Sequence, residues 1–121
     1  MTKKIMIIDD SFTIRKTAEG FLKETEYELI LVENGYEALT KIMDLKPDLI
    51  LCDLNMPKLE GFEMCKILKQ NEEYEDIPII ILSSSNGLLD ISKGKLNGCD
   101  DYLIKPFKKE ILLEVIKKYL K

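Results

Sequence analysis

The chain has 121 residues, of which 45% are hydrophobic and 33% charged, a composition typical of one globular domain with a real core. Its net charge is −4 and its lysines are scattered among acidic residues. It therefore lacks the basic stripe of a nucleic-acid-binding protein, and we expect no nucleic-acid partner. Histidine is absent, which excludes imidazole chemistry and leaves carboxylates, hydroxyls and lysine as the reactive groups.

The N-terminus and the cysteines bear on the compartment. The opening MTKKIMIIDD has too few apolar residues before Asp9 for a signal peptide, and no apolar run reaches the length of a membrane span. We therefore expect a cytoplasmic protein without membrane insertion. Cys52, Cys65 and Cys99 are widely spaced and form no CxxC pair, so they fit neither a zinc site nor a disulfide framework. We expect them to be small buried hydrophobic residues.

Five short apolar runs predict strands. Except for the second run, they lack an alternating polar face, which is typical of strands that are covered on both sides in a parallel sheet. The runs are KIMII (4–8), YELILV (27–32), LILC (49–52), IPIIIL (77–82) and YLI (102–104).

Helical periodicity follows each predicted strand. The fourth helix, over residues 88–97, carries Gly94 in its interior at a cost of about 1 kcal/mol relative to alanine, and we expect it to be short or mobile. The residues that mark the other helices are Ile14, Ala18, Phe21 and Leu22; Asn34, Glu37, Leu39, Ile42 and Met43; Gly61, Cys65 and Leu68; and Ile111, Leu112, Val115, Ile116 and Tyr119.

This alternation predicts an α/β fold: an open, doubly wound, five-stranded parallel sheet with helices on both faces and right-handed crossovers. In such sheets the ligand binds beyond the carboxyl ends of the strands, near the point where the strand order reverses.

Polar residues follow four of the predicted strands directly. The second strand ends at Glu33–Asn34, which we interpret as helix capping only. If the strand order is 2-1-3-4-5, the first and third strands are neighbours, and carboxylates from distant parts of the chain share one basin. The residues after the four strands are Asp9 and Asp10; Asp53 and Asn55; Ser83, Ser84 and Ser85; and Lys105 and Pro106.

Clustered carboxylates raise one another's pKa unless a cation neutralises them. An all-oxygen set suits a hard divalent ion, and a few carboxylates with waters suit Mg²⁺. Lys105 adds a fixed positive charge, and a carboxylate beside Mg²⁺ is a competent nucleophile for in-line phosphoryl transfer. Each group alone has a simpler interpretation as a helix cap, a turn, a loop or an exposed lysine. These interpretations do not explain why all four groups lie at carboxyl ends.

Four motifs, MIIDDS, LILCDLNMPKLEG, IPIIILSS and DDYLIKPF, resemble in order and spacing those of the CheY-like receiver domain of bacterial two-component response regulators. The resemblance runs from Lys4 to Lys121. It implies a flavodoxin-like (βα)5 fold with strand order 2-1-3-4-5, which is the order known for CheY. It also implies one receiver domain over residues 1–121 without an output domain, and a regulatory phospho-acceptor rather than an enzyme.

The resemblance also implies roles for the site residues. Asp53 is the phospho-acceptor, and Lys105 pairs with it and with a phosphoryl oxygen. Asp10 and Asp53 ligate Mg²⁺, Asn55 offers its backbone carbonyl, and Asp9 acts mainly through water. The bond between Lys105 and Pro106 is cis. Ser83 is the switch hydroxyl, and Tyr102 is the aromatic residue that follows it.

The implied partners are a sensor histidine kinase or histidine phosphotransfer protein upstream, and a protein target on the face of the fourth helix, fifth strand and fifth helix. The pathway is chemotaxis or pilus motility. The segments DDSFTIRKTAEGFL and ILSSSNGLLDISKGKLNG resemble the twitching-motility branch, whose members act with type IV pili.

Three other classes share part of the pattern. A phosphotransferase of the haloacid dehalogenase type also uses Asp, Ser or Thr, Lys and acidic metal ligands, but its nucleophile normally follows the first strand. A flavodoxin-like electron carrier needs a hydroxyl- and glycine-rich loop where this chain has Asp9 and Asp10. A receiver-fold interaction module without phosphorylation does not need the complete set of acids, hydroxyl and lysine.

Overall fold

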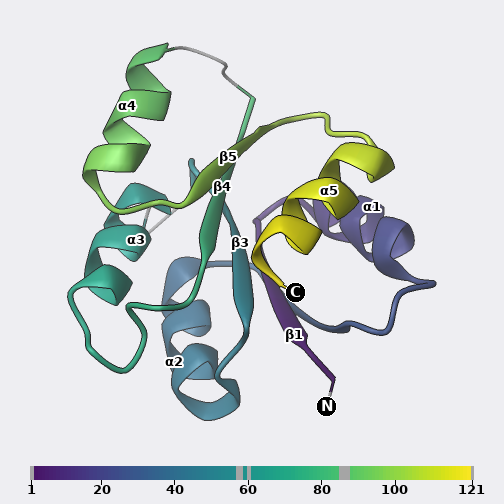
Figure 1. Ribbon diagram of the computed structural model, residues 1–121, viewed down its shortest axis with the longest axis horizontal. Helices are drawn as coiled ribbons and strands as arrows, with labels where there is room; N and C mark the ends of the chain where they lie inside the picture. Colours follow the sequence, from purple (N-terminus) through teal and green to yellow (C-terminus); the bar gives the residue numbers. More distant parts are fainter. Residues whose placement is uncertain (1, 57–58, 60, 85–87, 121) are drawn as a thin grey trace.

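The computed structural model describes residues 2–56, 59, 61–84 and 88–120. In this part of the chain, strands and helices alternate as the sequence predicted (Figure 1). Their order is β1 (Lys4–Ile8), α1 (Phe12–Leu22), β2 (Glu28–Val32), α2 (Gly35–Leu45), β3 (Leu49–Asp53), α3 (Gly61–Lys69), β4 (Ile79–Ser83), α4 (Leu88–Leu96), β5 (Asp101–Ile104) and α5 (Lys109–Tyr119). None of these described helices combines the length and apolar character that crossing a membrane requires.

The described strands form one parallel sheet in the order β2-β1-β3-β4-β5, which confirms the predicted topology. The predicted ends shift slightly. β4 begins at Ile79 rather than Ile77, because the intervening Pro78 has no N–H to donate to the ladder. β3 and β4 extend to Asp53 and Ser83, so both polar residues are the last residues of their strands.

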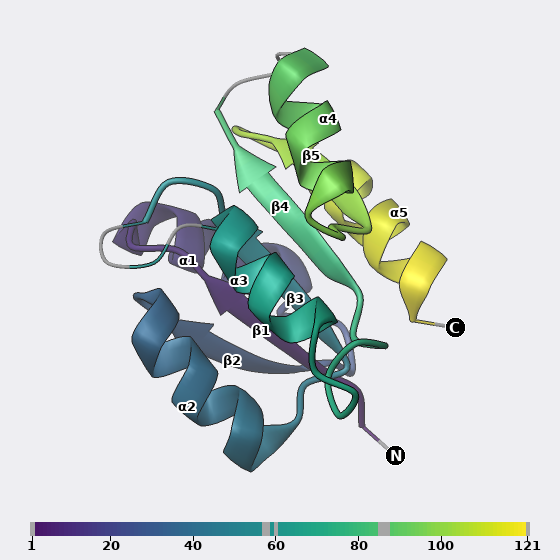
Figure 2. The same cartoon turned by 90° about the vertical axis from the view of Figure 1, so that its left-hand side faces the viewer.

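The sheet has a hydrophobic core on each face. Ile5 and Ile7 of β1 pack in the cluster that also contains α1 and α5 residues, whereas Met6 and Ile8 pack in the cluster with α2 and α3 residues. Figures 1 and 2 show α1 and α5 on one side of the sheet, and α2, α3 and α4 on the other. Because β3 is covered on both faces, each of its residues is buried, which explains the apolar run over residues 49–52.

Local signals fix several helix boundaries. The Ser11 hydroxyl accepts a hydrogen bond from the Ile14 N–H at 3.3 Å, and the Asn34 side chain accepts one from the Glu37 N–H at 2.9 Å, so these residues are the N-caps of α1 and α2. α4 has nine residues, as α3 does, against eleven in α1, α2 and α5, which agrees with the expectation of a short helix. Its mobility stays a prediction.

The expectation of unpaired cysteines is wrong for Cys65 and Cys99. They form a disulfide between α3 and the segment that leads from α4 into β5, with Cα atoms 5.9 Å apart. Cys52, buried in β3, is a free thiol as expected. The paired cysteines are 34 positions apart in the sequence. Only the packing of α3 beside the start of β5 brings them together, and spacing alone does not report this.

Candidate functional site

Three carboxylates converge at the carboxyl ends of β1 and β3. One carboxylate oxygen from each of Asp9, Asp10 and Asp53 lies within 4.8 Å of the other two. Asp9 is fully buried and Asp53 is 4% exposed, whereas Asp10 is exposed, so the cluster opens to solvent at Asp10. The strand order makes β1 and β3 neighbours and thereby brings together residues from distant parts of the sequence.

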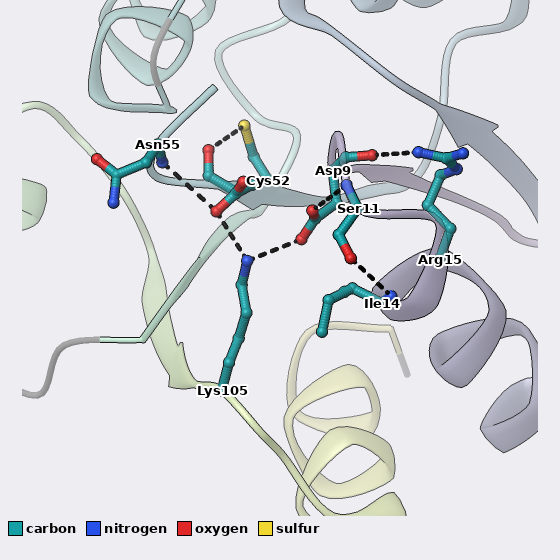
Figure 3. A network of polar contacts seen from close by, with 8 residues as sticks. Asp9, Ser11, Ile14, Arg15, Cys52, Asn55 and Lys105 are labelled. Atoms are coloured by element: carbon teal, nitrogen blue, oxygen red, sulfur yellow. Dashed lines mark hydrogen bonds and ion pairs between the residues drawn. The ribbon is translucent and has the colours of Figure 1, made fainter. Parts of the chain in front are cut away.

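Lys105 joins the two buried acids. It follows β5 directly, and its ammonium donates hydrogen bonds to Asp9 Oδ2 and Asp53 Oδ1, both at 2.9 Å. Figure 3 shows the lysine side chain extending between Asp9 and the end of β3. The bond from Lys105 to Pro106 is cis, as the resemblance implied. One ammonium therefore holds carboxylates from two strands, where the sequence had led us to expect a contact with Asp53.

The Asp9 carboxylate uses both of its oxygens. Oδ1 accepts a hydrogen bond from the Ser11 N–H at 2.9 Å, and Oδ2 accepts from Lys105. The simpler interpretation of this segment as a helix cap is therefore correct for Ser11, whose hydroxyl caps α1. The Asp9 carboxylate itself orders the turn and faces the lysine.

The Asp53 carboxylate also accepts a hydrogen bond from the backbone just after β3. Its Oδ1 accepts from the Asn55 N–H at 3.4 Å, a long contact, in addition to the bond from Lys105. Asn55 is exposed. The start of α3 lies close to the end of β3, since a Cβ on Gly61 would lie 2.7 Å from the Asp53 carbonyl oxygen. A glycine is required at position 61 because α3 begins in close contact with the Asp53 backbone.

Burial and charge together set the protonation of the site. Burial raises the pKa of Asp53, although the hydrogen bond from Lys105 opposes the shift, and the nearby Asp9 charge raises it further. Burial lowers the pKa of Lys105, but its bonds to Asp53 and Asp9 outweigh burial and leave that pKa raised. The site thus carries more negative charge than its one ammonium neutralises, which favours the arrival of a further cation.

Cys52 precedes the acid in β3 and does not compete with it as a nucleophile. Burial, reinforced by the charges of Asp53 and Asp9, raises the pKa of the Cys52 thiol far above neutrality. The protonated thiol donates to the Asp53 carbonyl oxygen at 3.5 Å (Figure 3). Because the thiolate is the reactive form, Cys52 is a packing residue at this position.

Arg15 belongs to the surroundings of the site, and the sequence had not pointed to it. Its guanidinium donates to the Asp9 carbonyl oxygen at 2.7 Å and lies 3.7 Å from the Glu33 carboxylate. Glu33, which we had assigned to helix capping only, thus pairs across the ends of β1 and β2. The sequence held a signal for this contact, because Arg15 lies in the first turn or so of a helix that follows two acidic residues.

The remaining predicted residues lie on the β4–β5 side of the site. Ser83 is buried at the end of β4, and its carbonyl oxygen accepts from the Lys105 N–H at 2.7 Å. Tyr102 in β5 is partly buried and packs against the core cluster on the α2 and α3 face. Ser84 is exposed, and Ser85 lies outside the described residues.

The donor set fits a hard divalent cation. Its side-chain ligands are carboxylate oxygens, close enough together for one ion to reach all three acids. Lys105 already engages Asp9 Oδ2 and Asp53 Oδ1, so an ion would share these oxygens with the ammonium or use the remaining oxygens of the cluster. The exposed Asp10 gives it access from solvent.

Comparison with known proteins gives the family. The family model described as response regulator receiver domain matches residues 5–117. Protein PilG of Pseudomonas aeruginosa is 46% identical over 117 residues, which cover 97% of this chain and 87% of PilG. The chain spans 50% and 48% of the length of other relatives that it matches.

Solved structures of receiver domains have the same fold as this chain. The chemotaxis protein CheY4 of Vibrio cholerae is 32% identical with a TM-score of 0.93, and the match covers 99% of this chain and 100% of CheY4. The receiver domain of a sensor histidine kinase from Pseudomonas aeruginosa, solved with a magnesium ion coordinated in the active site cleft, is 26% identical with a TM-score of 0.89 and 98% of both chains covered. Receiver domains take phosphate from histidine kinases and act on downstream targets. This chain belongs to the response regulator receiver domain family.

Proposed function

We propose that the chain is a phospho-accepting response regulator in which Asp53 receives the phosphoryl group. The observation that carries the proposal is the position of this carboxylate. It lies at the end of β3, almost fully buried, beside two further acids and 2.9 Å from the Lys105 ammonium. A nucleophile held in this way is positioned before its substrate arrives, which lowers the entropic part of the barrier.

In the proposed reaction, an Asp53 carboxylate oxygen attacks the phosphorus of a phosphohistidine on a sensor kinase or histidine phosphotransfer protein. A P–O bond forms and the P–N bond breaks. The bonding electron pair stays on the imidazole nitrogen, which takes a proton from solvent. The product is an acyl phosphate on Asp53, and the chain assists only its own phosphorylation and dephosphorylation.

The surrounding residues divide the work. Asp9, Asp10 and Asp53, with the Asn55 backbone carbonyl, would hold Mg²⁺, which supplies positive charge to the incoming phosphoryl oxygens. Lys105 exchanges its carboxylate partner for a phosphoryl oxygen. The Ser83 hydroxyl, on the neighbouring strand, donates to another oxygen of the group.

The output would leave through the α4–β5–α5 side. Phosphorylation adds strong acceptor oxygens, and we infer that Ser83 moves toward them while Tyr102 shifts inward behind it. Tyr102 lines two grooves, of about 320 Å³ beside α4 and about 430 Å³ beside α5, so a change in its position alters both. An exposure of Tyr102 that is the same with and without beryllofluoride and Mg²⁺ would count against this route.

For the pathway, we propose the twitching-motility branch with its type IV pili, a pathway of the chemotaxis kind. The 46% identity to Protein PilG supports it. Of the two segments that carry the resemblance, one begins at Asp9 in the acidic cluster and runs through α1, and the other begins at Ile81 in β4.

Incubation with acetyl phosphate and Mg²⁺, followed by intact-mass measurement, tests the function. The protein should gain the mass of one phosphoryl group, and the gain should vanish in Asp53→Asn or when the metal is chelated. Asp44→Asn, an exposed acid of α2, is the matched control and should be phosphorylated like the unmodified protein. Equal uptake by Asp53→Asn would refute the acceptor assignment. Sustained turnover of an external phosphomonoester would instead indicate an enzyme.

A further inference from the structure

The segment between α4 and β5 is fastened to α3 at several points. The Cys65–Cys99 disulfide links it covalently to the middle of the helix. One turn further along α3, the Lys69 ammonium pairs with the Asp100 carboxylate at 3.0 Å. Just before these links in the sequence, Gly98 has φ of +90° and packs so closely that a Cβ would lie 2.8 Å from Lys69 Cγ. The C-terminal end of α4 therefore has its anchor on α3.

The two cysteine residues differ in exposure. Cys65 is fully buried in α3. Cys99 is partly exposed and lines the groove beside α4, together with Ile91 and Tyr102. An external thiolate therefore meets Cys99 first. This matters because a disulfide exchanges only when an attacking sulfur can reach one of its two atoms.

We propose that Cys65 and Cys99 form a reversible thiol–disulfide site, whose substrate is a small dithiol or a low-molecular-weight disulfide, and which controls how firmly the end of α4 is held to α3. A reductant thiolate attacks Cys99 Sγ, the protein S–S bond breaks, and the electron pair leaves on the Cys65 sulfur, which takes a proton. The second thiol of the reductant resolves the mixed disulfide. Two electrons and two protons pass to the protein, and the reductant becomes a disulfide.

Burial of the leaving sulfur makes this exchange slow until the region opens. Attack at Cys99 leaves the electron pair on Cys65, and apolar surroundings disfavour a thiolate. When α4 moves away from α3, the Cys65 sulfur becomes less buried and the barrier falls. The disulfide is therefore protected kinetically while α4 stays packed on α3. The reverse step, driven by a low-molecular-weight disulfide, closes the link again.

Reduction frees α4 more than β5. The Asp100 N–H donates to the Ile79 carbonyl oxygen at 2.8 Å, and the Lys69 ion pair remains, so the start of β5 keeps its place. The end of α4 loses its covalent anchor. Since Cys99 and Tyr102 line the same groove, the redox state reaches the surface that we propose for output. This last consequence rests on the proposed function, whereas the redox site itself does not.

Alkylation under denaturing conditions tests the site. Protein equilibrated with oxidised dithiothreitol should take one iodoacetamide label, on Cys52, and protein treated with reduced dithiothreitol should take three, since the chain has three cysteines. Three labels under both conditions would overturn the proposal. Phosphorylation plays no part in this measurement, so its outcome is independent of the Asp53 assignment.

Hydrogen exchange then tests the control of α4. Reduction should speed backbone exchange in residues 88–99 by about tenfold, with little change in α2. Cys99→Ala should show the fast rate under both conditions, and Cys52→Ala should respond to reduction like the unmodified protein. If a cysteine variant fails to fold, the unmodified protein with and without reductant gives the same comparison. Equal exchange in both redox states would refute the anchoring role.

Discussion

The acidic site and the α4–β5 side of the molecule use opposite designs. At the acidic site, polar groups are buried and each oxygen of Asp9 has a defined donor. On the α4–β5 side, apolar groups face solvent: Leu96 is 88% exposed and Ile104 is 43% exposed. Buried, charge-paired groups suit a small ionic ligand, whereas exposed apolar side chains beside grooves suit a protein partner.

β5 connects the two regions. Tyr102 lies in its middle and lines both grooves, and Lys105 follows its last residue and holds the two buried acids. A change in the partner of the lysine therefore acts on the same short strand that carries the aromatic side chain. This arrangement suggests how a charge placed at one region would alter the surface of the other.

Among the links that join separate segments, the disulfide on the α4–β5 side should have the largest effect on stability. Reduction of the Cys65–Cys99 disulfide should lower the free energy of unfolding by about 3 kcal/mol, because opening a loop whose cysteines are 34 positions apart in the sequence returns chain entropy to the unfolded state. Urea unfolding with and without dithiothreitol measures it, and Cys99→Ala should lose the difference. If the unmodified protein has the same urea midpoint with and without dithiothreitol, the disulfide does not stabilise the fold.

Among these links, removal of the Lys105 ammonium at the acidic site should have the second-largest effect on the free energy of unfolding. Lys105→Met leaves Asp9 and Asp53 buried without their cation and should cost about 2 kcal/mol at pH 7. Because the pKa of Lys105 is raised in the folded protein, the stability that its ammonium contributes is fully present below pH 10.5. That stability is lost as the pH rises through the higher pKa of the folded state. Lys108→Met, an exposed neighbour, is the control. If both variants unfold at the same urea concentration, the bridge contributes nothing to stability.

A smaller effect of opposite sign should follow from Asp53→Asn. At pH 7 this variant should be more stable by about 1 kcal/mol, because it removes a buried charge while Lys105 keeps Asp9 as a partner. Asp53 has a raised pKa, so the unmodified protein gains stability as pH falls through that value and its acid becomes neutral. The difference should therefore narrow on acidification. Thermal unfolding between pH 7 and 4 measures it, and a widening difference would contradict the burial effect.

The smallest effect should come from the exposed surface. Ile104→Ala should change the free energy of unfolding by less than about 0.5 kcal/mol, while Leu103→Ala, the neighbour that is 5% exposed, should cost about 3 kcal/mol. Urea unfolding of the pair separates a side chain that the fold does not need from one that packs in the core. A large loss for Ile104→Ala would show that this side chain is structural.

The sequence predicted most of the fold because its signals are local. The apolar runs gave all five strands to within two residues, and Asn34 gave the start of α2. The convergence of Asp9, Asp10 and Asp53 could be predicted because parallel strands end at one edge of a sheet. The motif resemblance supplied the strand order on which this depended.

What the sequence did not predict depends on packing between distant segments. The Cys65–Cys99 pair needs α3 beside the start of β5, and the two bonds of Lys105 need a side-chain direction that no periodicity encodes. The Arg15 contact with Glu33 joins the first turn of α1 to the end of β2. In each case the partners are separated in the chain and meet only in the folded protein.

The most direct test of the phosphoryl-transfer account is to locate the modified residue. Protein treated with acetyl phosphate and Mg²⁺ is reduced with borohydride, which converts an aspartyl phosphate to homoserine, and its peptides are sequenced by mass spectrometry. We expect homoserine at position 53 alone. Homoserine at Asp9 or Asp10, or at no aspartate under conditions that phosphorylate a control receiver, would contradict the account.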